Sequence, residues 1–498
     1  MEEKETIDEN QEELGTVEIP PPTGVFGQPW SMQKLLGLMA VFGPAAIVAS
    51  VSIGAGETIV VVRSGAWARY DLLWLVLISC IVKGVFLTYL LGRYTAVSGE
   101  YLGHRLVRLP GPRGWFLLMI MLVELIGGPM AWVPIAKPCA DLFHFLLNGV
   151  PQSIPEPIWE NIFTSAFIGL ALLLSLKMSY NRLEKQQVII CLILVTGTII
   201  GTLMVRPDLW QAFIGSVNVG HLPAFPEWTP EDARQNPLLT MATTFAYVGG
   251  GAMGYIVYAN WIGLHRWGLT GHQNIDAIRD YAFKNEAIDY LPDAPEQVSR
   301  LRQLVAPLRW DAGMGAVVLF IVTAAFMISG AAVLYPLESR FEGWSLLTEQ
   351  AHVWSNIHPS LVWVYYVCII AALWGTLQAV PEVLTRVSHE FLEALWPSRE
   401  WPYSKIQRFI CAYFFVSTFI VIWADLKFDI LTQIAGTLGN FAISFVMVLA
   451  LRLNSKLPRS YQTHRVMWIG GFISALIQIA FAGVSIWSLG GKIFGGGQ

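Results

Sequence analysis

The chain has 498 residues, of which 54% are hydrophobic and only 14% carry a charge. Soluble globular proteins have about 25% charged residues, so this composition excludes a water-soluble chain and indicates a membrane protein. The formal net charge of -4 lacks the basic excess that nucleic-acid binding requires, and we expect no nucleic-acid partner.

The first 33 residues form the first distinct region. They carry eight acidic residues against one lysine and include three consecutive prolines at 20–22. A signal peptide needs a basic start followed by an apolar run, and this segment has neither. We therefore predict a disordered acidic tail at residues 1–33.

From residue 34 onward, mainly apolar stretches recur that are long enough to cross about 30 Å of hydrocarbon as a helix. We count eleven, which predicts an all-α polytopic membrane protein with one transmembrane domain at 34–490. The domain is divided into a first five-helix repeat at 34–205, a second at 237–452 and an eleventh helix at 466–489. The predicted spans are 36–62, 72–95, 114–145, 159–178, 186–205, 237–264, 309–335, 360–386, 406–425, 429–452 and 466–489.

Basic residues in the loops predict the orientation. With the tail inside the cell, 23 of the 32 Lys and Arg lie in cytoplasmic segments and seven lie outside. Cytoplasmic loops of membrane proteins carry this excess of positive charge, so we expect a cytoplasmic N-terminus and an outside C-terminus in the cell membrane. The longest cytoplasmic loop, 265–308, mixes acidic and basic residues, and we expect it to form a short surface helix. We assign no catalytic or binding role to it.

Two spans carry glycine clusters at mid-membrane. The first reads Gly-Ala-Gly-Glu at 54–57, and the sixth reads Gly-Gly-Gly-Ala-Met-Gly-Tyr at 249–255. Each glycine weakens a helix by about 1 kcal/mol, and unwound backbone is tolerated in a membrane only where it is buried or lines a cavity. Breaks at matching positions of two five-helix halves favour the central site of a transporter. The alternative is that the glycines only allow close helix packing.

Glu57 lies at the first break. Inserting a carboxylate at the centre of a membrane costs at least about 2.5 kcal/mol, so Glu57 needs a bound cation, a proton or an ion-pair partner. The structural alternative is an ion pair with Lys83 of the second span or Lys137 of the third. Met253 lies at the second break, where its thioether either packs as an ordinary core residue or binds a metal. A carboxylate, a sulfur and free carbonyls together suit a borderline transition metal better than Mg²⁺ or Ca²⁺.

These two breaks carry a resemblance to a known family. The stretch from Gly43 through Glu57 to Trp74 resembles the first two helices of the Nramp family of divalent-metal transporters, which have a LeuT-type fold of two inverted five-helix repeats. The resemblance extends in order over nearly all of residues 34–490. It continues in Val123-Glu124-Leu125, Asn181-Arg182-Leu183-Glu184, Met253, Arg408 and Thr432-Gln433-Ile434.

The resemblance implies a set of metal ligands from which this chain partly departs. Where the family has Asp-Pro-Gly-Asn in its first helix, this chain has Gly54 in place of the metal-binding Asp and Glu57 in place of the Asn. Where the family has Met-Pro-His in its sixth helix, Met253 keeps the sulfur and the carbonyl ligand belongs to Gly250. The resemblance also implies that Gln433 approaches the ion.

The resemblance bears on proton movement as well. Tyr255 replaces the histidine tied to proton handling in the family, and Arg408 matches an arginine of its proton path. Glu124 stands where the family has an acid in the third helix. Seven and ten residues further on, Ala131 and Pro134 replace positions that are usually acidic in proton-coupled members. We therefore expect weak proton coupling.

We predict a secondary-active transporter that moves a divalent metal, either of the Mn/Fe type or Mg²⁺, by alternating access. Glu57 supplies the charge, Met253 the preference for softer ions, and carbonyls near Ala55 and Gly250 the remaining ligands. The alternative is a transporter of the same fold for a small anion or carboxylate, which Lys83, Lys137 and half-helix N-termini would suit. The direction in which Lys83 points distinguishes the two.

Other functional classes are disfavoured. No convergent acid, base and nucleophile set appears, and no loop exceeds about 45 residues, so we predict neither an enzyme nor a receptor. Broken helices in matching halves fit alternating access better than a channel pore. The five cysteines lie mostly in apolar stretches without metal-ligand spacing, so we expect core residues and no cofactor. The expected partners are the transported ion and lipid, with no obligate protein partner.

Overall fold

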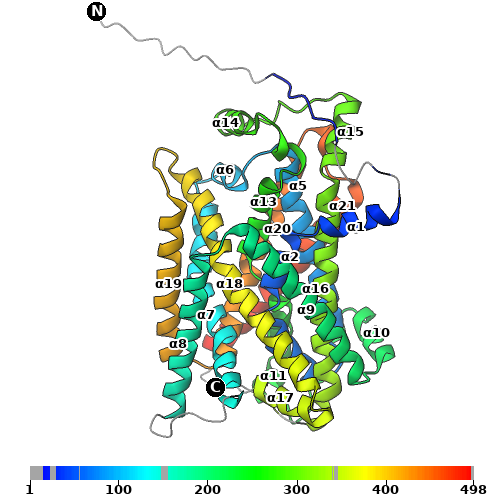
Figure 1. Cartoon of the computed structure of the whole chain (residues 1–498), viewed down its shortest axis with the longest axis vertical. Coiled ribbons are helices and arrows are strands. Elements are labelled where there is room, and N and C mark those ends of the chain that lie inside the picture. The colour runs from blue at the N-terminus through cyan, green and yellow to red at the C-terminus, as the bar shows by residue number, and fades with distance from the viewer. Residues whose placement is uncertain are drawn as a thin grey trace, which may run out of the picture.

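The computed structural model describes residues 15–22, 28, 30–54, 56–146, 155–338, 340 and 346–494. Over these residues the chain is helical and contains no strand, which confirms the predicted all-α fold class. Most long helices run along the long axis of the molecule (Figure 1).

Nine segments of the described chain are long and apolar enough to cross a membrane, and they correspond to nine of the eleven predicted spans. The first consists of α4 (Leu73–Ser79), the π-helix η3 (Cys80–Leu87) and α5 (Thr88–Ser98). The others contain α7 (Trp115–Leu146), α8 (Glu156–Ser175), α9 (Tyr180–Met204), α16 (Ala306–Val333), α18 (Leu361–Leu395), α19 (Tyr403–Trp423), α20 (Phe428–Ser455) and α21 (Arg465–Phe494).

The first predicted span is broken near its middle. Helix α2 (Pro44–Ser52) is followed by non-helical backbone, and then by the π-helix η2 (Gly56–Val61) and α3 (Val62–Ala68). The prediction began this span at residue 36, but residues 36–40 belong to a separate helix, α1 (Met32–Ala40), whose axis is bent by 53° from that of α2. Pro44 begins α2 because its missing N–H costs nothing in a first helical turn.

The sixth predicted span is broken as well. Four residues, 248–251, separate helix α12 (Pro237–Tyr247) from α13 (Ala252–Leu264). Gly249 and Gly250 have φ angles of +98° and +74°, which side-chain-bearing residues rarely adopt. The glycine clusters therefore produce the unwinding that the sequence predicts, and broken helices 1 and 6 are confirmed.

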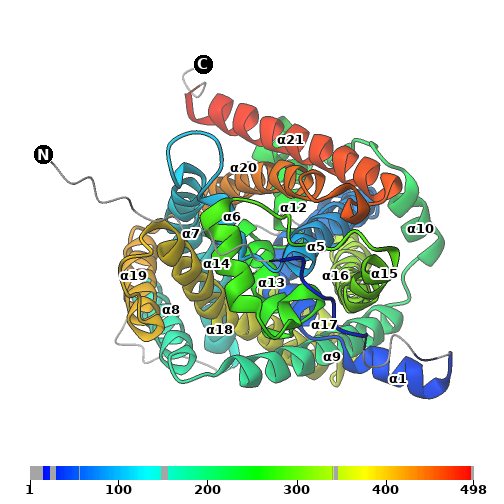
Figure 2. The same ribbon diagram turned by 90° about the horizontal axis from the view of Figure 1, so that it is seen from above.

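The broken helices lie inside the bundle. Helix α2 packs against α9, α16 and α18, and α13 packs against α5 and α18. Seen from above, α13 and α5 are surrounded by longer helices (Figure 2). The peripheral helices α8, α19 and α21 expose large apolar side chains, as expected for surfaces in contact with lipid. Examples are Leu170, Leu173, Phe415, Ile420, Ile469 and Ile473.

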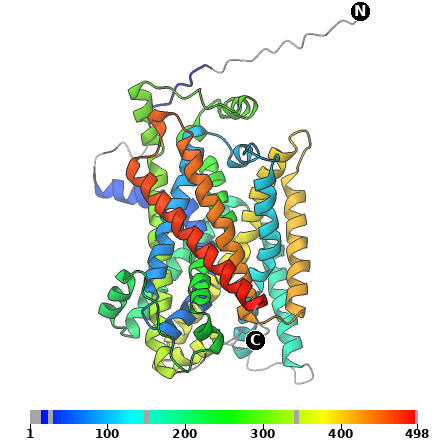
Figure 3. The ribbon, with the colours of Figure 1, turned by 180° about the vertical axis from the view of Figure 1, so that it is seen from behind.

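Short helices cover the two ends of the bundle. Helices α6 (Leu102–Leu106), α14 (Ile275–Asn285) and α15 (Pro295–Leu304) lie at one end, while α10 (Leu209–Val217), α11 (Glu231–Gln235) and α17 (Leu346–Ile357) lie toward the other (Figures 1 and 3). Loop 265–308 thus holds two helices where one was predicted. The 3₁₀ turns are η4 (Gly268–Gly271), η5 (Tyr335–Leu337) and η6 (Arg459–Tyr461).

Part of the predicted tail is packed against this loop. The amide of Val17 donates to the carbonyl of Tyr290 at 2.9 Å, and the amide of Ile19 donates to Oε1 of Gln297 at 2.7 Å. Ile19 is fully buried. Residues 15–22 therefore depart from the prediction of disorder, because their two apolar side chains find a partner surface. Residues 1–14, 23–27 and 29 lie outside the described residues.

Candidate functional site

A cavity of about 170 Å³ lies between the two helix breaks. Side chains of α7, α18, α19 and α20 complete its wall. Among the described residues that line it, Glu124 is the only one with an acidic or basic side chain. The polar and sulfur-bearing side chains of the wall include Ser52, Glu124, Met253 and Thr376.

Glu124 reaches this cavity from α7. Its Oε1 accepts a hydrogen bond from the amide of Met253 at 3.4 Å. That amide belongs to the first turn of α13, where backbone N–H groups have no partner within the helix and the helix dipole is positive. The start of α13 therefore stabilises a carboxylate at the cavity wall.

The second break supplies sulfur and backbone to the same wall. Met253 is buried and lines the cavity together with Gly249, Gly250 and Gly251. The described residues contain no group of three or more His, Cys, Asp and Glu that could hold a metal. Besides the single carboxylate, the described wall offers a cation neutral ligands: the Met253 sulfur, the hydroxyls of Ser52 and Thr376, and backbone carbonyls.

The two breaks approach each other closely at Gly250. A Cβ added to this glycine would lie 2.7 Å from Oγ of Ser52, at the end of α2. Gly54 also lines the cavity, and a Cβ there would lie 2.9 Å from Oγ1 of Thr376. The glycines thus bring backbone from both breaks to one space. Ala55, the remaining predicted site residue of the first break, lies outside the described residues.

Glu57 lies beside the cavity and connects the two breaks. Its side chain is fully buried. Oε2 accepts from the amide of Gly54 at 3.1 Å, and Oε1 accepts from the amide of Gly249 at 3.4 Å. The described cavity wall does not include Glu57. The structure therefore places this carboxylate between two unwound backbone segments, where the prediction had it in contact with the ion.

Lys83 lies on the π-helix η3 and is also fully buried. Its Nζ donates to the carbonyls of Phe245, Ala246 and Val248 at 2.6, 3.1 and 2.5 Å. The ammonium is thus directed at the end of α12, and the described cavity wall does not include it. Lys137, the other membrane-embedded lysine, has its Nζ 3.5 Å from Oδ1 of Asp425.

Tyr255 supports the second break from within α13. Its hydroxyl donates to the carbonyl of Gly249, and its side chain is buried away from the cavity wall. Tyr255 thereby fixes the backbone at the second break.

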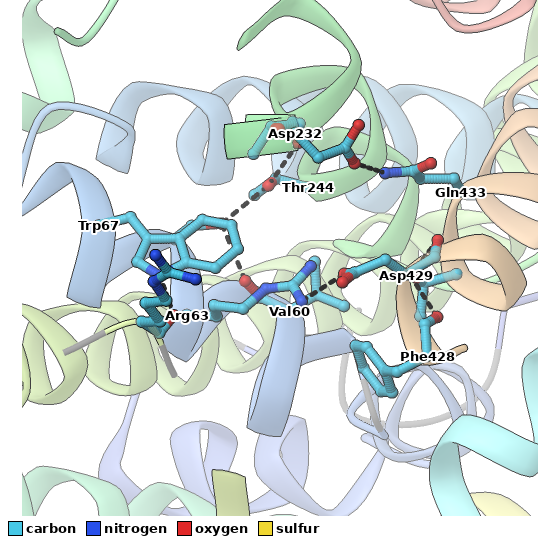
Figure 4. A network of polar contacts seen from close by, with 12 residues as sticks. Val60, Arg63, Trp67, Asp232, Thr244, Phe428, Asp429 and Gln433 are labelled. Carbon is cyan, nitrogen blue, oxygen red and sulfur yellow. Dashed lines mark hydrogen bonds and ion pairs between the residues drawn. The ribbon is translucent and has the colours of Figure 1, made fainter. Parts of the chain in front are cut away.

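Gln433 belongs to a separate polar network (Figure 4). Its Nε2 donates to Oδ2 of Asp232 at 3.1 Å, and its Oε1 accepts from Nζ of Lys492 at 3.0 Å. Burial alone would raise the pKa of Asp232, but hydrogen bonds from Lys492 and Gln433 outweigh it and hold that pKa below its ordinary value. In the same network Arg63 pairs with Asp429 at 2.5 Å.

Gln433 and Arg408, like Glu57, Lys83 and Tyr255, are not part of the described cavity wall. The amide of Gln433 is engaged in the network above, and Arg408 is exposed on α19 with its Nε donating to the carbonyl of Ser404 at 3.2 Å. Thr376 of α18 lines the cavity but was not predicted, because it lies in an unbroken helix with no ionisable neighbour in the sequence to mark it.

Comparison with known proteins gives a family and a fold. The model of the natural resistance-associated macrophage protein-like family, Nramp, matches residues 45–488. No curated protein matches the sequence. Crystal structures of two variants of the manganese transporter of Eremococcus coleocola are similar to this chain, with 16% and 15% sequence identity and TM-scores of 0.64 and 0.65. Each match covers 98% of this chain and 92% of the other.

Proposed function

This chain belongs to the Nramp family, and on that basis we propose that it transports divalent metal cations across a membrane by alternating access. The observation that carries the proposal is the cavity between the two helix breaks, with Glu124 and Met253 in its wall. The manganese transporter with a similar fold supports the same class of substrate. The protein is a multi-pass membrane protein, and we place it in the cell membrane.

The charge of the cavity wall favours a cation. An ionised Glu124 contributes one negative charge, while the side chains of Glu57 and Lys83 are buried outside the described wall. One carboxylate balances half the charge of a divalent ion, so the remaining ligands are neutral oxygens, water and the Met253 sulfur. A thioether is a better ligand for Cd²⁺, Fe²⁺ and Mn²⁺, in that order of softness, than for Mg²⁺, which prefers oxygen ligands.

The anion alternative required a positive charge facing the substrate. Lys83 was its main candidate, but the Lys83 ammonium contacts three backbone carbonyls at the end of α12. The described cavity wall contains no basic side chain, so no side-chain charge in it would balance a bound anion against the Glu124 carboxylate. This arrangement supports the metal over the anion.

We further propose that proton coupling is weak and that the N-terminus is cytoplasmic. Ala131, which replaces a usually acidic position, lines the cavity, and the Tyr255 hydroxyl is engaged with Gly249. Helix α1 lies in the half of the molecule nearer α14 and α15, whereas α21 ends in the other half (Figures 1 and 3), as expected for an odd number of crossings. Repeats at 34–205 and 237–452, followed by an eleventh helix at 466–489, fit this orientation.

The experiment is uptake by purified protein in proteoliposomes. We expect saturable uptake of Mn²⁺ and Cd²⁺, weaker uptake of Mg²⁺, no uptake of small carboxylates, and little acidification of the lumen. Protein-free liposomes and the Glu124→Gln variant are the controls. Uptake of an anion without uptake of any divalent metal would overturn the proposal, and lumen acidification that tracks metal uptake would overturn weak proton coupling.

A further inference from the structure

The end of α12 presents a group of buried carbonyl oxygens. The last carbonyls of any helix lack partners within the helix and lie at the negative end of its dipole. Here Nζ of Lys83 lies 2.6, 3.1 and 2.5 Å from the carbonyl oxygens of Phe245, Ala246 and Val248. The hydroxyl of Ser79, one turn earlier, also donates to Phe245 and Val248, at 3.1 and 2.8 Å. One face of the second span therefore supplies all these donors.

The ligand set around the ammonium is the set that binds an inorganic monovalent cation. Carbonyls at the C-terminal end of a half-helix coordinate such ions where membrane helices unwind. A primary ammonium has three N–H donors, and three carbonyls accept them. Nζ also lies 4.8 Å from the centre of the Phe245 ring, which adds a cation–π contact. Lys83 is fully buried, so water does not compete for these oxygens.

The peptide group between Val248 and Gly249 also contacts an acidic side chain, that of Glu57. The carbonyl of Val248 accepts from Lys83, and the amide of Gly249 donates to Glu57. Successive backbone groups are thus satisfied by a positive and a negative side chain from two other spans. Removing one partner of such a buried arrangement leaves the other charge uncompensated, so the two side chains stabilise each other's burial.

We propose that Lys83 is a tethered cation that permanently fills the carbonyl site at the end of α12, so that no inorganic monovalent cation binds at this break. The side chain cannot leave with the substrate, and metal transport therefore needs neither Na⁺ nor K⁺. This second consequence rests on the proposed transport function, whereas occupancy of the carbonyl site does not.

The test is thermal unfolding of purified wild-type, Lys83→Ala and Lys83→Met proteins in choline, Na⁺, K⁺ or methylammonium chloride at equal ionic strength. The wild-type melting temperature should be the same in all four salts. Lys83→Ala opens the carbonyl site to small cations, so its melting temperature should be lowest in choline and rise by about 2 °C or more in at least one other salt. Lys83→Met fills the space with an apolar chain and should melt early in every salt.

Two results would overturn the proposal. One is a Lys83→Ala protein that melts at the same temperature in all four salts, and the other is a wild-type protein stabilised by Na⁺ or K⁺ over choline. If the alanine variant does not fold, wild-type melting and Mn²⁺ uptake in the same salts decide instead. The rate of Mn²⁺ uptake should differ by less than about twofold among the four salts. A requirement of uptake for Na⁺ or K⁺ would refute the tethered cation. The melting experiment needs no metal uptake, so its failure is distinct from failure of the proposed transport.

Discussion

Glu57 offers the sharpest test of how the two helix breaks are held together. Its two carboxylate oxygens accept hydrogen bonds from the amides of Gly54 and Gly249 at 3.1 and 3.4 Å, and the side chain is fully buried. Glu57→Ala removes both of these acceptors. Glu57→Gln keeps one oxygen acceptor but places an NH₂ donor against the second amide.

The expected losses follow from these contacts. A buried N–H group left without a partner costs about 1 to 3 kcal/mol. In the alanine variant the Gly54 amide still donates to the carbonyl of Ser52 at 3.0 Å, so the Gly249 amide is the one that loses its acceptor. The free energy of unfolding should therefore fall by about 1 to 3 kcal/mol, before any cost of the cavity that the substitution creates. The glutamine variant keeps one oxygen that can accept from the Gly249 amide, so it should lose less than the alanine variant. Because the neutral amide also removes the cost of burying a charge, we expect its loss near the lower end of that range.

Thermal unfolding of the purified proteins, monitored by tryptophan fluorescence, measures the order of their stabilities directly. We expect wild type to melt highest, Glu57→Gln next and Glu57→Ala lowest. Glu124→Gln is the matched control, because the Glu124 carboxylate accepts one amide at 3.4 Å and faces the cavity. A Glu57→Gln protein that melts with wild type but no longer binds Mn²⁺ would show that Glu57 is a metal ligand and refute its bridging role.

Three further outcomes follow from the same structure. Met253→Ala should weaken binding of Cd²⁺ and Mn²⁺ more than binding of Mg²⁺ in calorimetric titrations, and equal losses would exclude a sulfur ligand. Gly250→Ala should destabilise the fold by about 1 to 3 kcal/mol because of its positive φ and the nearby Ser52, whereas Gly254→Ala, with open space around its Cβ, should be tolerated. Burial lowers the pKa of His104 to about 4, so folding favours the neutral ring and stability should fall as pH drops from about 6.5 toward 4. His104→Phe should flatten that part of a melting-temperature profile against pH, and an unchanged slope would assign it to other groups.

The helix breaks could be predicted because glycine acts locally. Gly249 and Gly250 adopt positive φ angles that the sequence alone makes accessible, and both breaks lie where the glycine clusters occur. Apolar length likewise predicted the nine unbroken spans, because a helix in lipid must satisfy its own backbone over the whole crossing.

The acid that faces the cavity could not be predicted in the same way. Glu57 stands inside a break motif and Glu124 in an unbroken helix, yet Glu124 lines the cavity and Glu57 lies behind its wall. Side-chain directions follow a 3.6-residue period only in regular helix, and Glu57 lies in a π-helical turn directly after non-helical backbone. Its orientation is therefore set by distant partners such as Gly249.

The contacts of Lys83 could not be predicted from the sequence either. Its charge and its place in an apolar span predicted a buried lysine, but its partners lie 162 to 165 residues away along the chain. They are backbone carbonyls, which every residue carries and which no sequence pattern marks. Only the position of the α12 end beside the second span makes them a cation site.

Calorimetric titration of Mn²⁺ into wild type, Glu124→Gln and Glu57→Gln tests the central claim, that Glu124 is the carboxylate that binds the transported metal. Glu124→Gln should lose at least about tenfold in affinity, or about 1.4 kcal/mol, while its melting temperature stays close to that of wild type. Glu57→Gln should melt earlier but retain binding once folded. Wild-type affinity in Glu124→Gln, together with lost binding in a stably folded Glu57→Gln, would contradict this assignment.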